Sequence, residues 1–198
     1  MTRRVRQLAL PDDDPLFVGS YGGPLLLLPT KHKHGWWGCS NEAGDHVYDV
    51  EPTDYDRACE DGDFPFAVDL ERDGHADGWA LVLESPDPAR IIDVDGVATV
   101  VRWVGAETAV GLLSLAQQVP PDAFETTGLE VEVPDGGVSL FDSSADGRNP
   151  EHMDNGIQEF ALPAGRYAVE RVVSVEGVVE MDDGDEEVMT QLVRFRPL

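Results

Sequence analysis

Short apolar segments separated by glycine, proline or aspartate recur along this chain and limit what it can fold into. Three of them, FPFAVDLE, GWALVLES and VATVVRWV, begin at residues 64, 78 and 97. Each is short and rich in branched or aromatic residues, which is typical of a β-strand. Breaks at such short intervals leave little room for long helices, so we expect mostly antiparallel β-structure.

Helical periodicity occurs in two places. In residues 107–119 the apolar side chains recur at helical spacing, and Pro120 and Pro121 end the pattern. Thr53 and Asp56 have the spacing of a capping box, which predicts a short helix over about 54–61. The expected fold class is therefore α+β, mostly antiparallel β with one good helix at about 107–119 and one short helix at about 54–61.

Turn residues predict three pairs of adjacent strands. The first joins the two apolar halves of LFVGSYGGPLLLLP at Gly22-Gly23-Pro24, and the second joins GLEVEV to VSLFD across PDGG. The third joins RYAVERVVSVEGVV to EVMTQLVRFRP across DDGDEE. Pro120-Pro121 is the best boundary between lobes. We expect an N-terminal lobe over 1–119 and a hairpin-rich C-terminal lobe over 120–198, packed as one compact unit.

An excess of acidic residues dominates the charge of the chain. The 39 Asp and Glu against 14 Lys and Arg leave a formal net charge of −25. A field of this sign repels nucleic acid and anionic membranes and attracts basic partners. An acid-rich proteome would produce the same total, so the cause of the charge stays open.

The sequence also bears on the compartment. No apolar stretch approaches the roughly 20 residues of a membrane span. The N-terminus lacks the apolar segment of a signal peptide, and the two cysteines are too few for a disulfide framework. We expect a cytoplasmic protein.

The densest acids lie in residues 42–63, where nine acidic residues accompany one arginine. Trp36 and Trp37 precede them in a glycine-flanked loop, where either one indole is exposed as an anchor or both pack on the core. Asp54 and Asp56 have a structural explanation as helix caps. The candidate partner-binding residues are Trp36, Trp37, Asp45, Asp49, Asp54, Asp56, Arg57 and Asp61. Arg57 can also pair with Asp61 four residues further on.

No pattern predicts a metal, a cofactor or a catalytic residue. His32, His34 and Cys39 lack the spacing of a zinc site. Cys59 would need a histidine partner to act as a nucleophile, and its place on the apolar face of the short helix favours an inert core thiol. Acids are so numerous that a carboxylate pair carries no information without geometry. A small hydrolase using such a pair or Cys59, or an acid-rich housekeeping protein, is the alternative to a binding protein.

Several segments together resemble a known family. They are GGP followed by LLLLP, the loop after Trp37, TDYDRAC, ALVLESPDP and VVRWVGAE, within about residues 16–118. In these segments the chain is similar to family twenty-one of the immunity proteins of bacterial polymorphic toxin systems, and DYDRAC with GGP upstream is the most specific part.

This resemblance implies a small cytosolic antidote that binds a toxin domain and blocks it, with no chemistry of its own. Because the chain is acidic, we expect the cognate toxin domain to be basic. The resemblance names neither the toxin nor the residues that bind it.

Overall fold

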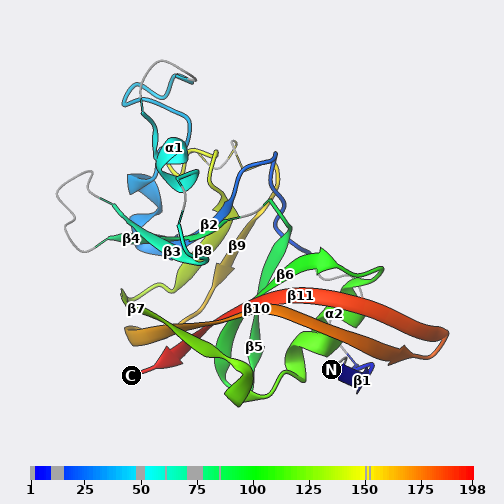
Figure 1. Cartoon of the computed structure of the whole chain (residues 1–198). Helices are drawn as coiled ribbons and strands as arrows, with labels where there is room; N and C mark the ends of the chain where they lie inside the picture. Colours follow the sequence, from blue (N-terminus) through cyan, green and yellow to red (C-terminus); the bar gives the residue numbers. More distant parts are fainter. Residues whose placement is uncertain are drawn as a thin grey trace.

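Two β-sheets packed face to face form the protein (Figure 1). The computed structural model describes residues 3–9, 16–47, 52–60, 62–70, 78–84, 86–149, 151 and 153–198. Except for one parallel pair, the strands that the sheets join are antiparallel. The structure confirms the expected α+β class with mostly antiparallel β-structure.

The larger sheet, sheet A, has the order β1-β10-β11-β6-β5, and β7 also pairs with β10. The long strand β10 holds β7 along its first half and β1, in parallel, along its second half. The strands are β1 (Arg3–Arg6), β5 (Ala89–Val94), β6 (Val97–Gly105), β7 (Glu125–Val133), β10 (Gly165–Met181) and β11 (Gly184–Pro197).

The smaller sheet, sheet B, has the order β3-β4-β2-β8-β9. Its strands are β2 (Leu25–Pro29), β3 (Phe66–Asp69), β4 (Trp79–Leu83), β8 (Val138–Asp142) and β9 (Ile157–Phe160). The helices are α1 (Asp54–Ala58) and α2 (Ala109–Gln117), with 3-10 helices η1 (Thr30–Gly35) and η3 (Pro121–Ala123).

The core has three parts, and sheet B is covered on both of its faces. Leu25 and Leu27 of β2 point into the apolar layer between the sheets, while Leu26 and Leu28 point into a second cluster on the outer face of sheet B. This explains why β2 is a continuous apolar run and not an alternating one. A third cluster lies between α2 and sheet A.

Both predicted helices are present and shorter than expected. The α1 helix ends at Ala58 and α2 covers 109–117. The α1 capping box is confirmed: the Asp56 N–H donates to Thr53 Oγ1 over 3.2 Å, and the Thr53 N–H donates to Asp56 Oδ2 over 2.6 Å.

One of the three predicted strand pairs forms as expected. The β10–β11 hairpin is confirmed, with Met181 opposite Gly184 at its turn. The pair around Gly22 is wrong, because the described residues directly before this turn, 16–21, make an isolated bridge from Val18 to Ala89 in place of a strand.

The predicted hairpin of residues 128–142 is also wrong in its pairing, although both strands exist. The β7 strand belongs to sheet A and β8 to sheet B. Val131 and Val133 of β7 and Val138 and Leu140 of β8 all enter the layer between the sheets. The turn between the strands therefore carries the chain from one sheet to the other across the core.

Each sheet contains strands from both sides of Pro120. In sheet A, β6 pairs with β11, and in sheet B, β2 pairs with β8. The ranges 1–119 and 120–198 therefore share both sheets.

Glu186 of β11 joins the hairpin to the start of α2. Its side chain is buried, and its Oε1 accepts hydrogen bonds from the N–H groups of Glu107, at 2.6 Å, and Thr108, at 2.7 Å. The hydroxyl of Thr108 donates to Oε2 over 2.6 Å. A carboxylate in this position meets the positive end of the helix dipole.

We predict that Glu186→Ala lowers the free energy of unfolding by about 2–3 kcal/mol, because three donors lose their acceptor in a buried place. Urea denaturation measures the change. Glu187→Ala is the matched control, since Glu187 is exposed, and it should change stability by less than about 0.5 kcal/mol. Equal stability of the two variants would contradict the capping role.

Candidate partner-binding surface

The predicted site lies on loops that cover the outer face of sheet B. Residues 36–47, α1 and residues 143–149 come together there, at the top of Figure 1 and away from the β10–β11 turn. We call the group of Trp37, Glu42, Asp45, Asp56 and Arg148 the Trp37 surface. Glu42, Asp45 and Asp56 are exposed, and Trp37 and Arg148 are partly buried.

The two adjacent tryptophans point in opposite directions. Trp36 is 0% exposed and belongs to the cluster on the outer face of sheet B, where its Nε1 donates to the carbonyl of Ser143 over 2.8 Å. Its backbone is extended, so the next side chain turns to the other side. Trp37 is therefore left at the surface, and Trp36 is an anchor of the loop within the core.

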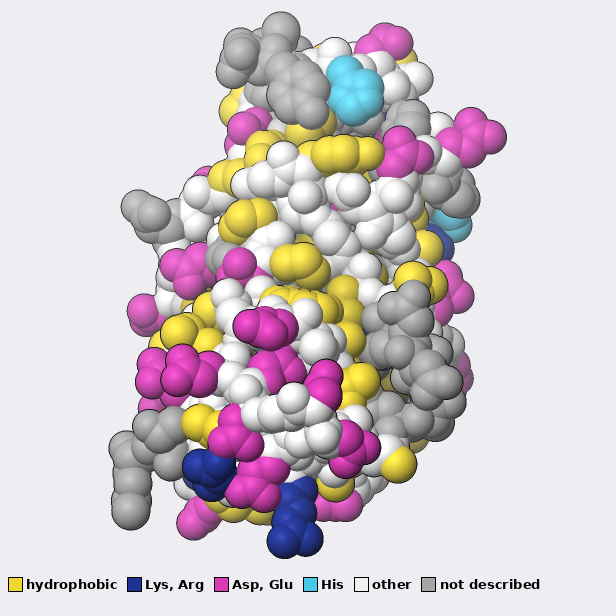
Figure 2. Space-filling model, turned by 90° about the vertical axis from the view of Figure 1, so that its right-hand side faces the viewer, with side chains coloured by type: hydrophobic (Ala, Val, Ile, Leu, Met, Phe, Trp, Pro, Cys, Tyr) yellow, Lys and Arg dark blue, Asp and Glu magenta, His cyan; other side chains and the backbone are white. Residues whose placement is uncertain are grey.

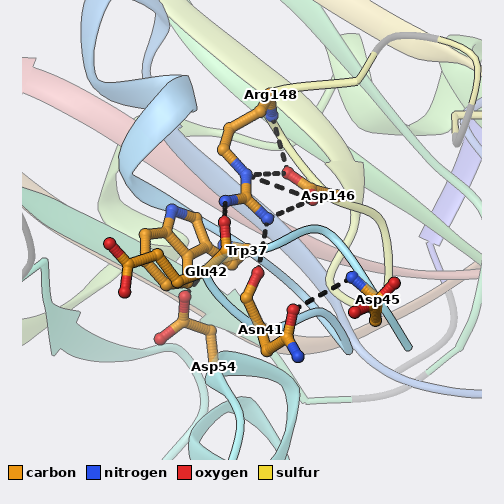
Figure 3. A network of polar contacts seen from close by, with 7 residues as sticks. All are labelled: Trp37, Asn41, Glu42, Asp45, Asp54, Asp146 and Arg148. Atoms are coloured by element: carbon orange, nitrogen blue, oxygen red, sulfur yellow. Dashed lines mark hydrogen bonds and ion pairs between the residues drawn. The ribbon is translucent and has the colours of Figure 1, made fainter. Parts of the chain in front are cut away.

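Arg148 holds the loops of this surface together (Figure 3). Its guanidinium lies 4.4 Å from the centre of the Trp37 ring. It pairs with Asp146, with 2.7 Å between Nη2 and Oδ2, and it donates to the carbonyls of Asn41, at 2.8 Å, and Glu42, at 3.0 Å. A planar group with several donors can make all of these contacts at once.

Asp54 fastens α1 to the same loop. It is 1% exposed, its Oδ2 accepts the N–H of Trp37 over 2.8 Å, and its Oδ1 pairs with Arg57 over 3.2 Å. Arg57 also donates to the carbonyl of Asp69. Asp54 and Arg57 thus position the loop. The predicted partner of Arg57, Asp61, lies outside the described residues, as does Asp49.

The exposed carboxylates of Glu42 and Asp45 lie on the loop that Arg148 and Asp54 hold in place. The N–H of Asp45 donates to Oδ1 of Asn41 over 3.0 Å, which closes the turn that carries Asp45. Figure 3 shows the carboxylate of Glu42 pointing away from Arg148. The structure therefore brings Trp37 and Asp45 into one group of loops and places Trp36 and Asp54 beneath them, whereas Asp56 caps α1.

Sequence reasoning missed Arg148 as the organising residue. Arg148 is the single Lys or Arg of residues 143–155, in a chain with 14 such residues among 198. An isolated arginine two positions after an aspartate, in an acidic chain, was the available signal.

Tyr55 and Gly23 link the two most specific segments of the family resemblance. A side chain at Gly23 would collide with the Tyr55 ring, so GGP and DYDRAC meet where only glycine fits. Burial raises the pKa of Tyr55 to about 12, and a hydrogen bond with Cys59 adds to the effect.

The expectation of a buried Cys59 is wrong. Cys59 is exposed, whereas Cys39 is buried. Because α1 ends at Ala58, Cys59 is the C-cap and its backbone leaves the helical conformation that would have kept it on the apolar face. Among the described residues, no group of three or more His, Cys, Asp or Glu is placed to hold a metal ion.

Fold and surface together define a two-sheet α+β protein whose loops display acidic groups around a tryptophan held by Arg148. The family model described as immunity protein 21 matches residues 16–181, and the chain belongs to this family. The match extends well beyond residue 118, where the resemblance seen in the sequence ended.

Further comparisons add no relative. No curated protein and no solved structure matches the chain. None of the helices in the described ranges is long and apolar enough to cross a membrane.

We predict that Arg148→Ala lowers the free energy of unfolding by about 1–3 kcal/mol, because Asp146 and two carbonyls lose a donor. Arg148→Lys should recover only part of this loss, since an ammonium cannot reproduce the fork of donors. Urea denaturation gives the stabilities, and near-ultraviolet circular dichroism reports the packing of Trp37.

Arg166→Ala is the control, because Arg166 is 67% exposed and pairs with the similarly exposed Glu130. A surface pair of this kind contributes about 0–1 kcal/mol. A loss for Arg148→Ala no larger than for Arg166→Ala would show that the loops do not depend on Arg148.

Proposed function

We propose that this protein is a non-enzymatic immunity protein that binds and neutralises a cognate toxin domain through the Trp37 surface. The observation that carries the proposal is the family match over residues 16–181. We further propose that it acts in the cytoplasm.

The charge of the chain supports a basic partner. With a formal net charge of −25, the protein repels polyanions and attracts positively charged surfaces over distances of about one Debye length. Toxin domains that act on anionic substrates carry basic clefts, and an acidic inhibitor associates with such a cleft faster than a neutral one. The total charge is thus suited to rapid capture of a toxin.

The construction of the Trp37 surface supports a contact role. A tryptophan ringed by polar groups is a common anchor of protein interfaces. Arg148 and Asp54 hold the loop before any partner binds, so little conformational freedom remains to be lost on association. Glu42 and Asp45 stand exposed near the indole and are available to basic side chains.

The proposal is tested with the toxin domain encoded beside the gene of this protein. Co-expression should restore growth to cells that make the toxin domain, and the purified proteins should form a complex at low salt. Failure of both would overturn the proposal and favour the hydrolase or housekeeping alternatives.

Reversal of charge tests the surface. We predict that Glu42→Lys with Asp45→Lys slows association with the toxin domain about tenfold or more and leaves stability unchanged, because both side chains are exposed. Stopped-flow association at several salt concentrations measures the effect.

Glu132→Lys with Asp135→Lys is the control, because it makes the same change of charge at two exposed positions of β7 and the turn after it. If both double variants slow association equally, the total charge and not the Trp37 surface steers the partner.

A further inference from the structure

The outer half of the β10–β11 hairpin has one covered face and one open face. On one side, Val175, Val179 and Val188 pack with α2. Strand alternation places Glu176, Val178, Glu187 and Met189 on the opposite side. We call these four residues, with Gly105 beside them, the open face.

Sheet B packs on this side of sheet A near the centre of the molecule. It does not extend over the open face of the hairpin. Val193 and Phe195 of β11 lie in the layer between the sheets. Further along β11, Gln191 receives a hydrogen bond from the buried Arg102, and beyond it Met189 is 39% exposed. Figure 1 shows the hairpin projecting past sheet B.

The open face has a hollow with an apolar floor. The hollow has a volume of about 330 Å³ and is lined by Gly105, Glu176, Val178, Glu187 and Met189, together with Gly177 and Val188. Met189 pairs with Gly105 on β6, and the missing side chain of this glycine leaves the space open. Half-buried Val178 and exposed Met189 offer apolar surface.

Two carboxylates line this hollow, and Arg4 of β1, which lies beside Val178 on the same face, pairs with Glu180 and Asp185 and not with either of them. Glu176 pairs with Met189 and Val178 with Glu187, so Glu176 and Glu187 are diagonal neighbours on one face. Both are exposed, and neither has an ion-pair partner among the described residues. Diagonal neighbours on one face are within reach of one long side chain, so a single cationic group can lie between both carboxylates.

A cationic side chain of the protein itself is bound by two carboxylates further along the same face. Glu180 and Asp185 stand opposite one another two residues further along the hairpin. Arg4 of β1 lies across them, with its Nε 2.7 Å from Glu180 Oε1 and its Nη2 bonded to Asp185 Oδ2. Figure 2 looks at the molecule from the side to which the hairpin projects and shows many Asp and Glu side chains there and few Lys or Arg.

We propose that the open face is a second contact surface for the toxin domain and takes an arginine or lysine side chain of it. The cationic group sits between Glu176 and Glu187, as Arg4 sits between Glu180 and Asp185, and the aliphatic stem lies on Val178 and Met189. The identity of the partner rests on the proposed function. The existence of a cation-binding face does not.

One partner can reach both surfaces. The open face and the face of sheet A that packs on sheet B are on the same side of sheet A. A toxin domain bound to the open face would therefore lie beside sheet B. Packed sheets are about 10 Å apart, and a domain of 100 residues has a radius of gyration of about 13 Å. Such a domain is tall enough to reach the loops on the outer face of sheet B.

The test uses the full chain with Glu176→Gln and Glu187→Gln and the toxin domain encoded beside its gene. The expected result is an affinity at least tenfold weaker, mainly through faster dissociation, as measured by surface plasmon resonance. Met189→Ala should weaken binding by about threefold or more, because it removes part of the floor. Thermal unfolding checks that each variant is folded.

The matched control is Glu132→Gln with Asp135→Asn, which removes the same charge elsewhere and should change affinity less than threefold. If wild type binds the toxin domain and the Glu176 and Glu187 variant binds equally well, the second contact surface is overturned and the proposed function stands. A wild type that does not bind the toxin domain overturns the proposed function instead.

A partner-independent probe tests the cation-binding face directly. N-acetyl-arginine amide is titrated into the labelled protein, and backbone amide shifts are followed by NMR. The largest shifts are expected at residues 176–178 and 187–189 and should vanish in the Glu176→Gln and Glu187→Gln variant. Shifts spread evenly over acidic positions would overturn the proposal even if the toxin domain binds.

Discussion

The requirement to cover sheet B on both faces organises this protein. Since β2 presents leucines to both sides, the outer face of sheet B needs a cover as much as the inner face does. The cover consists of α1 and loops, and Trp36 is its largest fully buried side chain. Burial of Trp36 leaves Trp37 at the surface. Packing in the core therefore fixes the position of the candidate contact residue, Trp37.

Acidic residues have two separate uses in the structure. Asp54, Asp146 and Glu186 are buried, and each accepts hydrogen bonds that join segments distant in the sequence or shape a loop. Glu42 and Asp45 near Trp37, and Glu176 and Glu187 on the hairpin, are exposed. Buried carboxylates keep a net benefit only when they are well bonded, whereas exposed ones act through their field. The formal charge alone does not separate the two groups.

Local patterns were reliable where the structure depends on neighbours in the sequence. The capping box at Thr53, the end of α2 before Pro120 and the β10–β11 turn all follow from residues within a few positions of each other. The pairing of β7 and β8 does not follow from nearby residues. Both strands alternate correctly and both face the core, but their partners are β10 and β2, far away in the sequence. The role of Arg148 likewise needs Asn41 and Glu42, more than 100 positions earlier.

The sequence by itself determined the β-rich class, the places of the two helices, the sign of the charge and the resemblance to an immunity protein family, because these depend on composition, local period and short motifs. Tertiary structure alone decided which strands share a sheet, that Trp36 is buried while Trp37 is not, and which acids face solvent. These features arise from contacts between distant segments, since burial and pairing depend on what lies opposite a residue and not on its neighbours along the chain.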